Sequence, residues 1–140
     1  MIDSIDLLVV DDDDITVEMV ERFQGKARSN FRVIPASDGR EALDILEGRS
    51  QKQVQRPFIV LLDLNMPRMN GFEFLKLVRE ESDWGDAVVF VLSTSDSEQD
   101  LQQAYRRNVA GYMIKSGGSQ KFGQLLDLLD DYASSVRLPE

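Results

Sequence analysis

Five short runs of apolar residues alternate with longer amphipathic stretches along the chain. The runs cover residues 5–10, 31–36, 58–62, 87–92 and 111–114. Several are continuous rather than alternating and are rich in Val, Ile and Leu, which is typical of strands buried on both faces of a parallel sheet. The pattern therefore predicts five parallel strands.

Between these runs, apolar side chains recur at the three- and four-residue spacing of a helix face, and we interpret these stripes as core packing. Asp38 followed by Glu41 is a variant of the capping box that opens a helix, and Ser95 or Ser97 is suited to cap the fourth helix. The five stripes are Ile15, Met19, Val20 and Phe23; Ala42, Leu43 and Leu46; Phe74, Leu75 and Val78; Leu101, Ala104 and Tyr105; and Phe122, Leu125, Leu126, Leu129, Tyr132 and Ala133.

Five β–α units without an internal repeat predict a doubly wound α/β fold. The polar segment 51–56 is expected to be a loop, and the residues from Ser134 onward are too few to form another domain. We therefore expect residues 1–140 to form one domain. Ligands of such folds bind beyond the carboxyl ends of the strands, near the switch in strand order.

Polar and charged residues follow four of the predicted strands directly. The first strand is followed by four aspartates, 11–14, and the third by Asp63. The fourth is followed by Ser93, Thr94 and Ser95, and the fifth by Lys115. Because the carboxyl ends of parallel strands lie at one edge, we expect carboxylate, hydroxyl and ammonium groups to converge there.

Such a cluster is suited to phosphoryl transfer. Neighbouring carboxylates repel one another, so at least one pKa should rise unless a counter-ion is bound. Mg²⁺ prefers a few carboxylates together with water and phosphate oxygens. A carboxylate beside the metal can attack phosphorus to form an aspartyl phosphate, while a lysine and a hydroxyl bind the phosphoryl oxygens. Taken singly, each residue has an ordinary structural explanation, and we interpret Asp13 and Asp14 as helix caps.

Composition narrows the chemistry further. The chain has no histidine and no cysteine, which excludes imidazole bases, phosphohistidine, thiol nucleophiles and disulfides within it. The net charge of −9 disfavours nucleic-acid binding. The N-terminus lacks a basic signal-peptide region, and the longest apolar run is far shorter than the ~20 residues of a membrane span. We expect a cytoplasmic protein that binds no membrane.

These motifs resemble the receiver domain of two-component response regulators over nearly the whole chain. The resemblance is carried by LLVVDD (7–12), LLDLNMPRMNG (61–71), VLSTSD (91–96) and GYMIK (111–115). It implies a flavodoxin-like fold with five helices around a parallel sheet of strand order 2-1-3-4-5. The segments RVIPASDGREAL and LSTSDSEQDL, with the polar insert before Arg56, look closest to single-domain regulators paired with phytochrome-type histidine kinases.

The resemblance also implies a role for each residue at the acidic edge. Asp63 looks like the phospho-acceptor. Asp12, Asp63 and the backbone carbonyl of Asn65 would bind Mg²⁺ directly, and Asp11 would act through water. The phosphoryl group would come from a histidine kinase or a phosphotransfer protein. The chain would be a signalling domain that assists its own phosphorylation and dephosphorylation, rather than an enzyme.

Four more residues match the family's phosphate-binding and switching positions. Lys115 and the backbone N–H of Thr94 would contact the phosphate. Ser93 would move toward it, and Tyr112 would change its rotamer. The surface formed by the fourth helix, fifth strand and fifth helix would then change shape. With no effector domain expected, the output would be binding to an unidentified protein partner, a homodimer, or nothing beyond storage of the phosphoryl group.

One position departs from the family pattern, which usually has proline after the lysine, often in a cis peptide. Here Ser116 follows Lys115. A cis bond before serine costs about 3 kcal/mol. We therefore predict a trans peptide and a looser loop that shifts Lys115 and weakens phosphorylation or its readout.

Two other functions are compatible with parts of the sequence. Asp12, Asp14 and Thr16 fit the D-x-D-x-T motif of haloacid-dehalogenase-type phosphatases, with Asp12 as nucleophile, but the second acidic pair of that family is missing. The other alternative is a receiver fold used as a binding module independent of phosphorylation, which the Ser116 departure keeps open.

Overall fold

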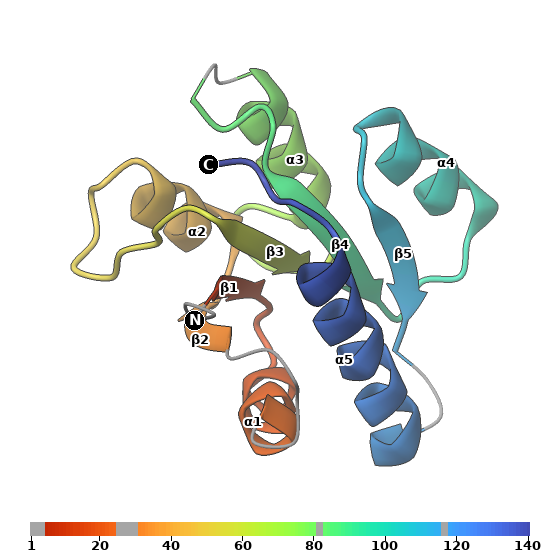
Figure 1. Ribbon diagram of the computed structural model, residues 1–140. Helices are drawn as coiled ribbons and strands as arrows, with labels where there is room; N and C mark the ends of the chain where they lie inside the picture. Colours follow the sequence, from red (N-terminus) through yellow and green to blue (C-terminus); the bar gives the residue numbers. More distant parts are fainter. Residues whose placement is uncertain (1–4, 25–30, 81–82, 116–117) are drawn as a thin grey trace.

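The computed structural model describes residues 5–80, 83–115 and 118–140 except for 25–30. Within them, strands and helices alternate strictly (Figure 1). The strands are β1 (Ile5–Val10), β2 (Phe31–Ala36), β3 (Phe58–Leu62), β4 (Val88–Ser93) and β5 (Gly111–Ile114). The helices are α1 (Asp14–Gln24), α2 (Gly39–Leu46), α3 (Gly71–Glu80), α4 (Glu98–Arg106) and α5 (Gly118–Ser135).

The five strands form one sheet in the order β2-β1-β3-β4-β5, and every neighbouring pair is parallel. This confirms the predicted doubly wound fold and its strand order. The prediction for β4 was wrong by one residue, because the strand pairs with β5 as far as Ser93↔Ile114. Ser93 is therefore the last residue of β4 rather than the first residue after it.

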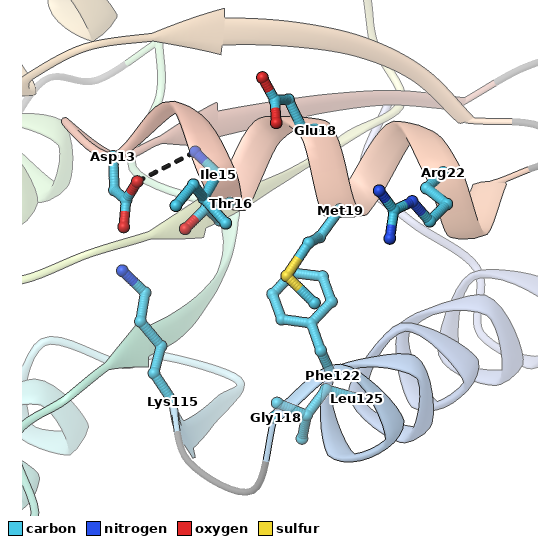
Figure 2. Close-up of a pocket in the computed structure, with 10 residues that line it drawn as sticks. All are labelled: Asp13, Ile15, Thr16, Glu18, Met19, Arg22, Lys115, Gly118, Phe122 and Leu125. Carbon is cyan, nitrogen blue, oxygen red and sulfur yellow. Dashed lines mark hydrogen bonds between the residues drawn. The ribbon is translucent and has the colours of Figure 1, made fainter.

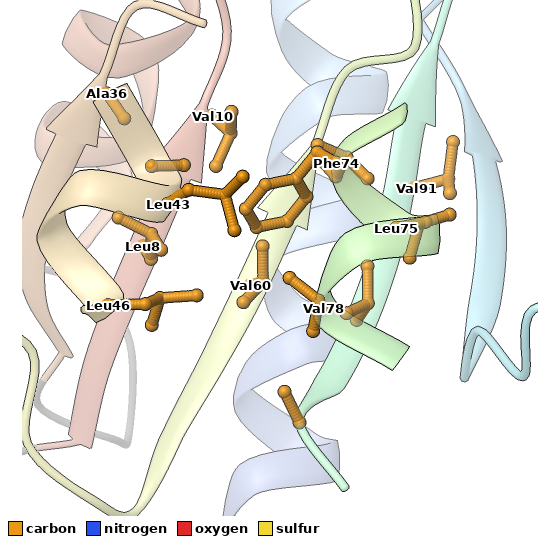
Figure 3. Packing of buried hydrophobic residues seen from close by; sticks show 14 of the residues in the cluster. Leu8, Val10, Ala36, Leu43, Leu46, Val60, Phe74, Leu75, Val78 and Val91 are labelled. Carbon is orange, nitrogen blue, oxygen red and sulfur yellow. The ribbon is translucent and has the colours of Figure 1, made fainter. Parts of the chain in front are cut away.

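One face of the sheet is covered by α2, α3 and α4. Alternate side chains of the strands, such as Leu8, Val60 and Val91, point to this face and belong to the same core cluster as Leu43 and Phe74 (Figure 3). The apolar residues of α3 (Phe74, Leu75 and Val78) are fully buried, as their spacing predicted. This core anchors the loops that follow β1 and β3, where the carboxylates lie.

The opposite face is covered by α1 and α5, which pack on the other set of alternate strand side chains. Because α5 meets the sheet with a full apolar stripe, Leu129 at its centre is completely buried. Leu138, beyond the end of α5, also packs into this core. The residues after Ser134 thus belong to the same fold.

Two residues that we interpreted as core lie on the surface instead. Ile15 is 59% exposed and Tyr105 is 48% exposed. Ile15 is the first residue of its stripe and Tyr105 is the last residue of its own, so each lies at an end of the buried row. Val20 and Ala104, from the same stripes, are buried as expected.

Side-chain caps fix where two of the helices begin. Asp38 is the N-cap of α2 and accepts a hydrogen bond from the Glu41 N–H at 2.9 Å. Ser97, one of the two serines considered, is the N-cap of α4 and accepts from the Asp100 N–H. The predicted loop over 51–56 contains neither helix nor strand. Within the described part of the chain, the helices are too short or too polar to cross a membrane.

Candidate functional site

The backbone holds two aspartates at the carboxyl edge of the sheet. The N–H of Asp11 donates to Ala36 O, and the N–H of Asp63 donates to Val10 O, both at 2.9 Å. Each bond continues the parallel ladder one residue beyond its strand. Both aspartates are buried, with Asp63 only 7% exposed, so the sheet sets the position of their side chains.

Three carboxylates converge at this edge, as the strand ends predicted. One oxygen from each of Asp11, Asp12 and Asp63 lies within 4.8 Å of the others. Asp12 is exposed, whereas the other two are buried. Because the three groups carry the same charge in a partly desolvated place, they favour the binding of a cation.

Lys115 brings a positive charge to the same cluster. Its Nζ lies 2.6 Å from Asp11 Oδ2 and 3.6 Å from Asp63 Oδ2. Its backbone N–H donates to Ser93 O at 2.8 Å, which holds the residue against the end of β4. Burial alone would lower the pKa of Lys115, but the hydrogen bond and charge of Asp11 and the charge of Asp63 outweigh it and raise the pKa. The ammonium therefore stays charged.

Asp63 has a raised pKa. The value rises from 3.8 to about 6, chiefly through burial and further through the charges of Asp11 and Asp12. Lys115 and the N–H of Asn65 act in the opposite direction but do not cancel it. The anion of Asp63 is thus destabilised, and a bound cation or an incoming electrophile would reduce this cost.

The loop that follows Asp63 turns back sharply to begin α3. The N–H of Asn65 points to Asp63 Oδ1 at a long 3.4 Å, and Asn65 is exposed. The N–H of Gly71 closes the loop onto Leu64 O at 3.0 Å. A Cβ at Gly71 would lie 2.4 Å from Asp63 O, so only glycine allows this close return.

The hydroxyl-bearing residues lie along the end of β4. Ser93 is fully buried, and its Oγ accepts a hydrogen bond from the Ser95 N–H at 3.2 Å. Thr94 is exposed. The hydroxyl of Tyr112 on β5 donates to Ser95 O at 2.9 Å, so this half-buried ring ties the loop after β4 to the neighbouring strand.

A groove of about 400 Å³ lies beside the acidic cluster, between α1 and α5 (Figure 2). Its wall is apolar, with Ile15, Met19 and Phe122 among the lining residues. At one end, the Lys115 ammonium and the Asp13 carboxylate point toward each other. Asp13 accepts from the Ile15 N–H, which agrees with its interpretation as a helix cap.

Residues 7–127 match the model of the response regulator receiver domain. The chain belongs to the response regulator receiver family. Receiver domains of this family accept a phosphoryl group on an aspartate, work with histidine kinases or phosphotransfer proteins, and bind a divalent metal through an acidic cluster.

Individual relatives support this assignment. The nitrate/nitrite response regulator NarL of Escherichia coli is 36% identical over 109 residues, which are 78% of this chain and 47% of NarL. The receiver chain thus spans about half the length of that relative. The response regulator Rcp1 of Synechocystis sp. is 27% identical over 135 residues, which are 95% of this chain and 92% of Rcp1.

Solved structures agree with the sequence relatives. The crystal structure of the phosphorylated cyanobacterial phytochrome response regulator RcpA has a TM-score of 0.90 and 26% identity, covering 99% of this receiver and 100% of that chain. The Mn²⁺-bound form of Rcp1 has a TM-score of 0.87 and 26% identity, covering 96% and 99%. The resemblance to phytochrome-associated regulators is therefore confirmed.

The donor set of the receiver fits a hard divalent cation. Carboxylate and carbonyl oxygens are the ligands that such ions prefer, and the chain offers no imidazole or thiolate to compete for a softer metal. Burial and the neighbouring carboxylates Asp11 and Asp12 raise the pKa of Asp63, which makes its anion costly at this edge. A divalent cation would offset the negative charge of the three carboxylates.

Sequence reasoning missed one feature of this edge, the ion pair between Arg68 and Asp38. Asp38 was recognised only as a helix cap, and nothing local in the sequence pairs two residues thirty positions apart. The predicted trans peptide between Lys115 and Ser116, with its looser loop, lies outside the described residues.

Proposed function

We propose that Asp63 is the phospho-acceptor of this receiver. A carboxylate oxygen of Asp63 attacks the phosphorus of a phosphohistidine on a histidine kinase or phosphotransfer protein. The new O–P bond forms as the P–N bond breaks, and the electron pair of that bond returns to the imidazole of the donor, which takes a proton from solvent.

A single observation carries this proposal: one buried carboxylate with a raised pKa lies beside two others and within 3.6 Å of an ammonium group. Burial and the neighbouring carboxylates destabilise the free anion of Asp63. A bond to phosphorus would remove the negative charge from the attacking carboxylate, and the charged phosphoryl oxygens would then lie near the ammonium. The neighbouring Asp12, which is exposed, lacks this environment.

We propose Mg²⁺ as the metal of this site. Asp12, Asp63 and the backbone carbonyl of Asn65 would hold it directly, and Asp11 would hold it through water. When bound, it would neutralise the carboxylates and the oxygens of the transferring group.

The remaining residues bind and orient the phosphoryl group. The ammonium of Lys115 would leave its place between Asp11 and Asp63 to pair with a phosphoryl oxygen. The Ser93 hydroxyl and the Thr94 N–H would donate hydrogen bonds to other oxygens. For Ser93 this requires giving up the bond that it accepts from Ser95, which links phosphorylation to the loop after β4.

The loop after β4 would pass the change on to the protein surface. The Tyr112 hydroxyl is hydrogen-bonded to Ser95 O, so a movement of Ser93 would shift the Tyr112 ring and the surface formed by α4, β5 and α5. We propose that residues 1–140 act as one receiver unit whose phosphorylation changes this surface for a protein partner or a second copy of the chain. Sedimentation equilibrium with and without phosphorylation tests the second copy.

Intact mass after incubation with acetyl phosphate and Mg²⁺ tests the proposal directly. Wild type should gain one phosphoryl group, Asp63→Asn should gain none, and Asp13→Asn should behave as wild type. Proteolytic mapping should place the adduct on the peptide that contains Asp63.

An adduct on Asp12, with turnover of small phosphomonoesters, would favour the phosphatase alternative instead. No adduct with acetyl phosphate or with phosphorylated histidine kinase, together with partner binding that ignores Mg²⁺, would favour the binding-module alternative.

A further inference from the structure

The loop between β3 and α3 is fastened to the start of α2 at two adjacent points. Arg68 Nε donates to Asp38 Oδ2 at 2.6 Å, and the Gly39 N–H donates to Met69 O at 3.0 Å. Arg68 follows Asn65 by three residues. Both contacts therefore act on the segment that carries the backbone carbonyl proposed to bind the metal.

Asp38 is a rigid partner for this contact. It is buried, and its other carboxylate oxygen accepts the Glu41 N–H at 2.9 Å as the cap of α2. Burial alone would raise the pKa of Asp38, but the hydrogen bonds from Arg68 and from the backbone of α2 outweigh it and lower the pKa. The anion that Arg68 contacts is thus fixed in place and charged.

Arg68 itself has an unfavourable backbone conformation. Its φ angle is +62°, in the left-handed region that glycine or asparagine adopts more readily. Its side chain is 65% exposed, so burial does not hold it there. The side-chain contact with Asp38 and the backbone contact of Met69 offset the strain. A Cβ at Gly39 would lie 2.9 Å from Met69 O, so the two turns are in direct contact and cannot approach further.

We infer that Arg68 and Asp38 are positioning residues for phosphoryl acceptance. The pair holds the loop so that Asp63 and the carbonyl of Asn65 are presented together at the sheet edge. Neither residue touches the phosphoryl group, and both act through the loop. The inference rests on the proposed function of Asp63 and adds a specific cause for the geometry of the site.

A matched pair of variants separates positioning from stability. Arg32 and Asp6 form a second ion pair between an exposed arginine and a buried aspartate, with side chains 51% and 6% exposed against 65% and 5% for Arg68 and Asp38. Asp6 lies at the opposite end of β1 from the acidic cluster. Arg68→Gln and Arg32→Gln both remove an ion pair between an exposed arginine and a buried aspartate. Arg32 makes two hydrogen bonds to Asp6 and one to Gln53 O, so its loss is the stricter control for stability. Only the Arg68 pair holds the loop.

Phosphorylation by acetyl phosphate at saturating Mg²⁺ is the first measurement. Arg68→Gln should lower its rate constant about tenfold, less than the 10²-fold that a 1 Å displacement can cost. Calorimetric titration with Mg²⁺ alone should show about tenfold weaker binding, at the lower end for residues that orient metal ligands. Arg32→Gln should leave both values at the wild-type level.

Two further variants keep the test independent of folding. Arg68→Gly suits the φ angle and should slow phosphorylation without lowering the melting temperature. Asp38→Ser keeps a capping oxygen but removes the charge, and it should have the same effect as Arg68→Gln. Because the two residues act as one pair, the double variant Asp38→Ser/Arg68→Gln should be no slower than either single variant.

Wild-type rates and Mg²⁺ affinities in both Arg68 variants would overturn the inference while leaving Asp63 as the acceptor. Equal losses in Arg68→Gln and Arg32→Gln would also overturn it, because the effect would then be one of general stability. Failure of the proposed function has a different signature: the wild-type protein itself would gain no phosphoryl group on Asp63.

Discussion

The ammonium of Lys115 lies 1.0 Å closer to Asp11 than to Asp63, since the two N–O distances are 2.6 and 3.6 Å. The lysine is therefore paired mainly with the aspartate that is proposed to act through water. This leaves Asp63 only partly compensated, so its pKa, which is raised chiefly by burial, stays at about 6 despite a nearby positive charge.

Replacing Lys115 by methionine should destabilise the metal-free protein by about 2 kcal/mol, because it leaves the buried carboxylates without their counter-ion. Mg²⁺ should recover more stability in this variant than in wild type. Urea unfolding with EDTA and with Mg²⁺ measures both effects. Lys121→Met, on the exposed surface of α5, is the control and should change neither. Equal behaviour of the two variants would contradict the role of Lys115 as counter-ion.

Asp63→Asn should stabilise the metal-free protein at pH 7.5. The folded protein holds a proton on Asp63 more tightly than the unfolded chain does. The free energy of unfolding of the wild type therefore falls as pH rises from about 4 to about 6, and the full cost of the buried anion is present above that range. A pKa of about 6 against the ordinary 3.8 corresponds to at most roughly 3 kcal/mol. The gain in the free energy of unfolding from Asp63→Asn should disappear near pH 4.

Urea unfolding of Asp63→Asn and wild type in EDTA, at pH 4 and pH 7.5, measures this difference. Asp127→Asn removes an exposed carboxylate of α5 as a control for net charge. A destabilised Asp63→Asn protein at pH 7.5 would show that this carboxylate contributes to folding rather than opposing it.

Mg²⁺ should raise the melting temperature at constant ionic strength, because it binds the folded cluster and not the unfolded chain. At a concentration 100 times Kd the stabilisation should be about 2.7 kcal/mol. Asp12→Asn should abolish most of this effect, while Asp13→Asn should retain it. An identical rise with NaCl of equal ionic strength would argue against a specific site.

Tyr112→Phe should lower the free energy of unfolding by about 1 kcal/mol, the usual value of a hydrogen bond such as the one donated to Ser95 O. Tyr105→Phe is the matched control, since Tyr105 lies exposed on α4. Thermal denaturation of the two variants gives the comparison. A loss in Tyr105→Phe as large as that in Tyr112→Phe would show that the bond to the loop contributes little.

The pattern of the sequence was sufficient to predict the fold and the place of the acidic cluster. Continuous apolar runs predicted buried parallel strands, and Asp11, Asp12, Asp63 and Lys115 were expected together because each follows a strand end. A parallel sheet brings such ends to one edge whatever the details of packing. The convergence of these four residues in space is what the topology required.

Local detail was less predictable where two environments compete. Ser93 ends β4 instead of following it, because pairing with β5 rather than hydrophobicity decides where the strand stops. Ile15 and Tyr105 lie at the ends of the apolar stripes of their helices, where a small change in helix orientation turns a side chain toward solvent. The spacing of apolar residues cannot predict whether a side chain at such a position is buried.

By itself, the sequence determined the α/β architecture, the acidic edge and the absence of any imidazole or thiol chemistry, because these follow from residue type and short-range periodicity. Only the tertiary structure decided how the charges are shared. The preference of Lys115 for Asp11, the raised pKa of Asp63 and the pairing of Arg68 with Asp38 all depend on distances between residues far apart in the chain. Burial and through-space charge interactions arise only when those segments pack together.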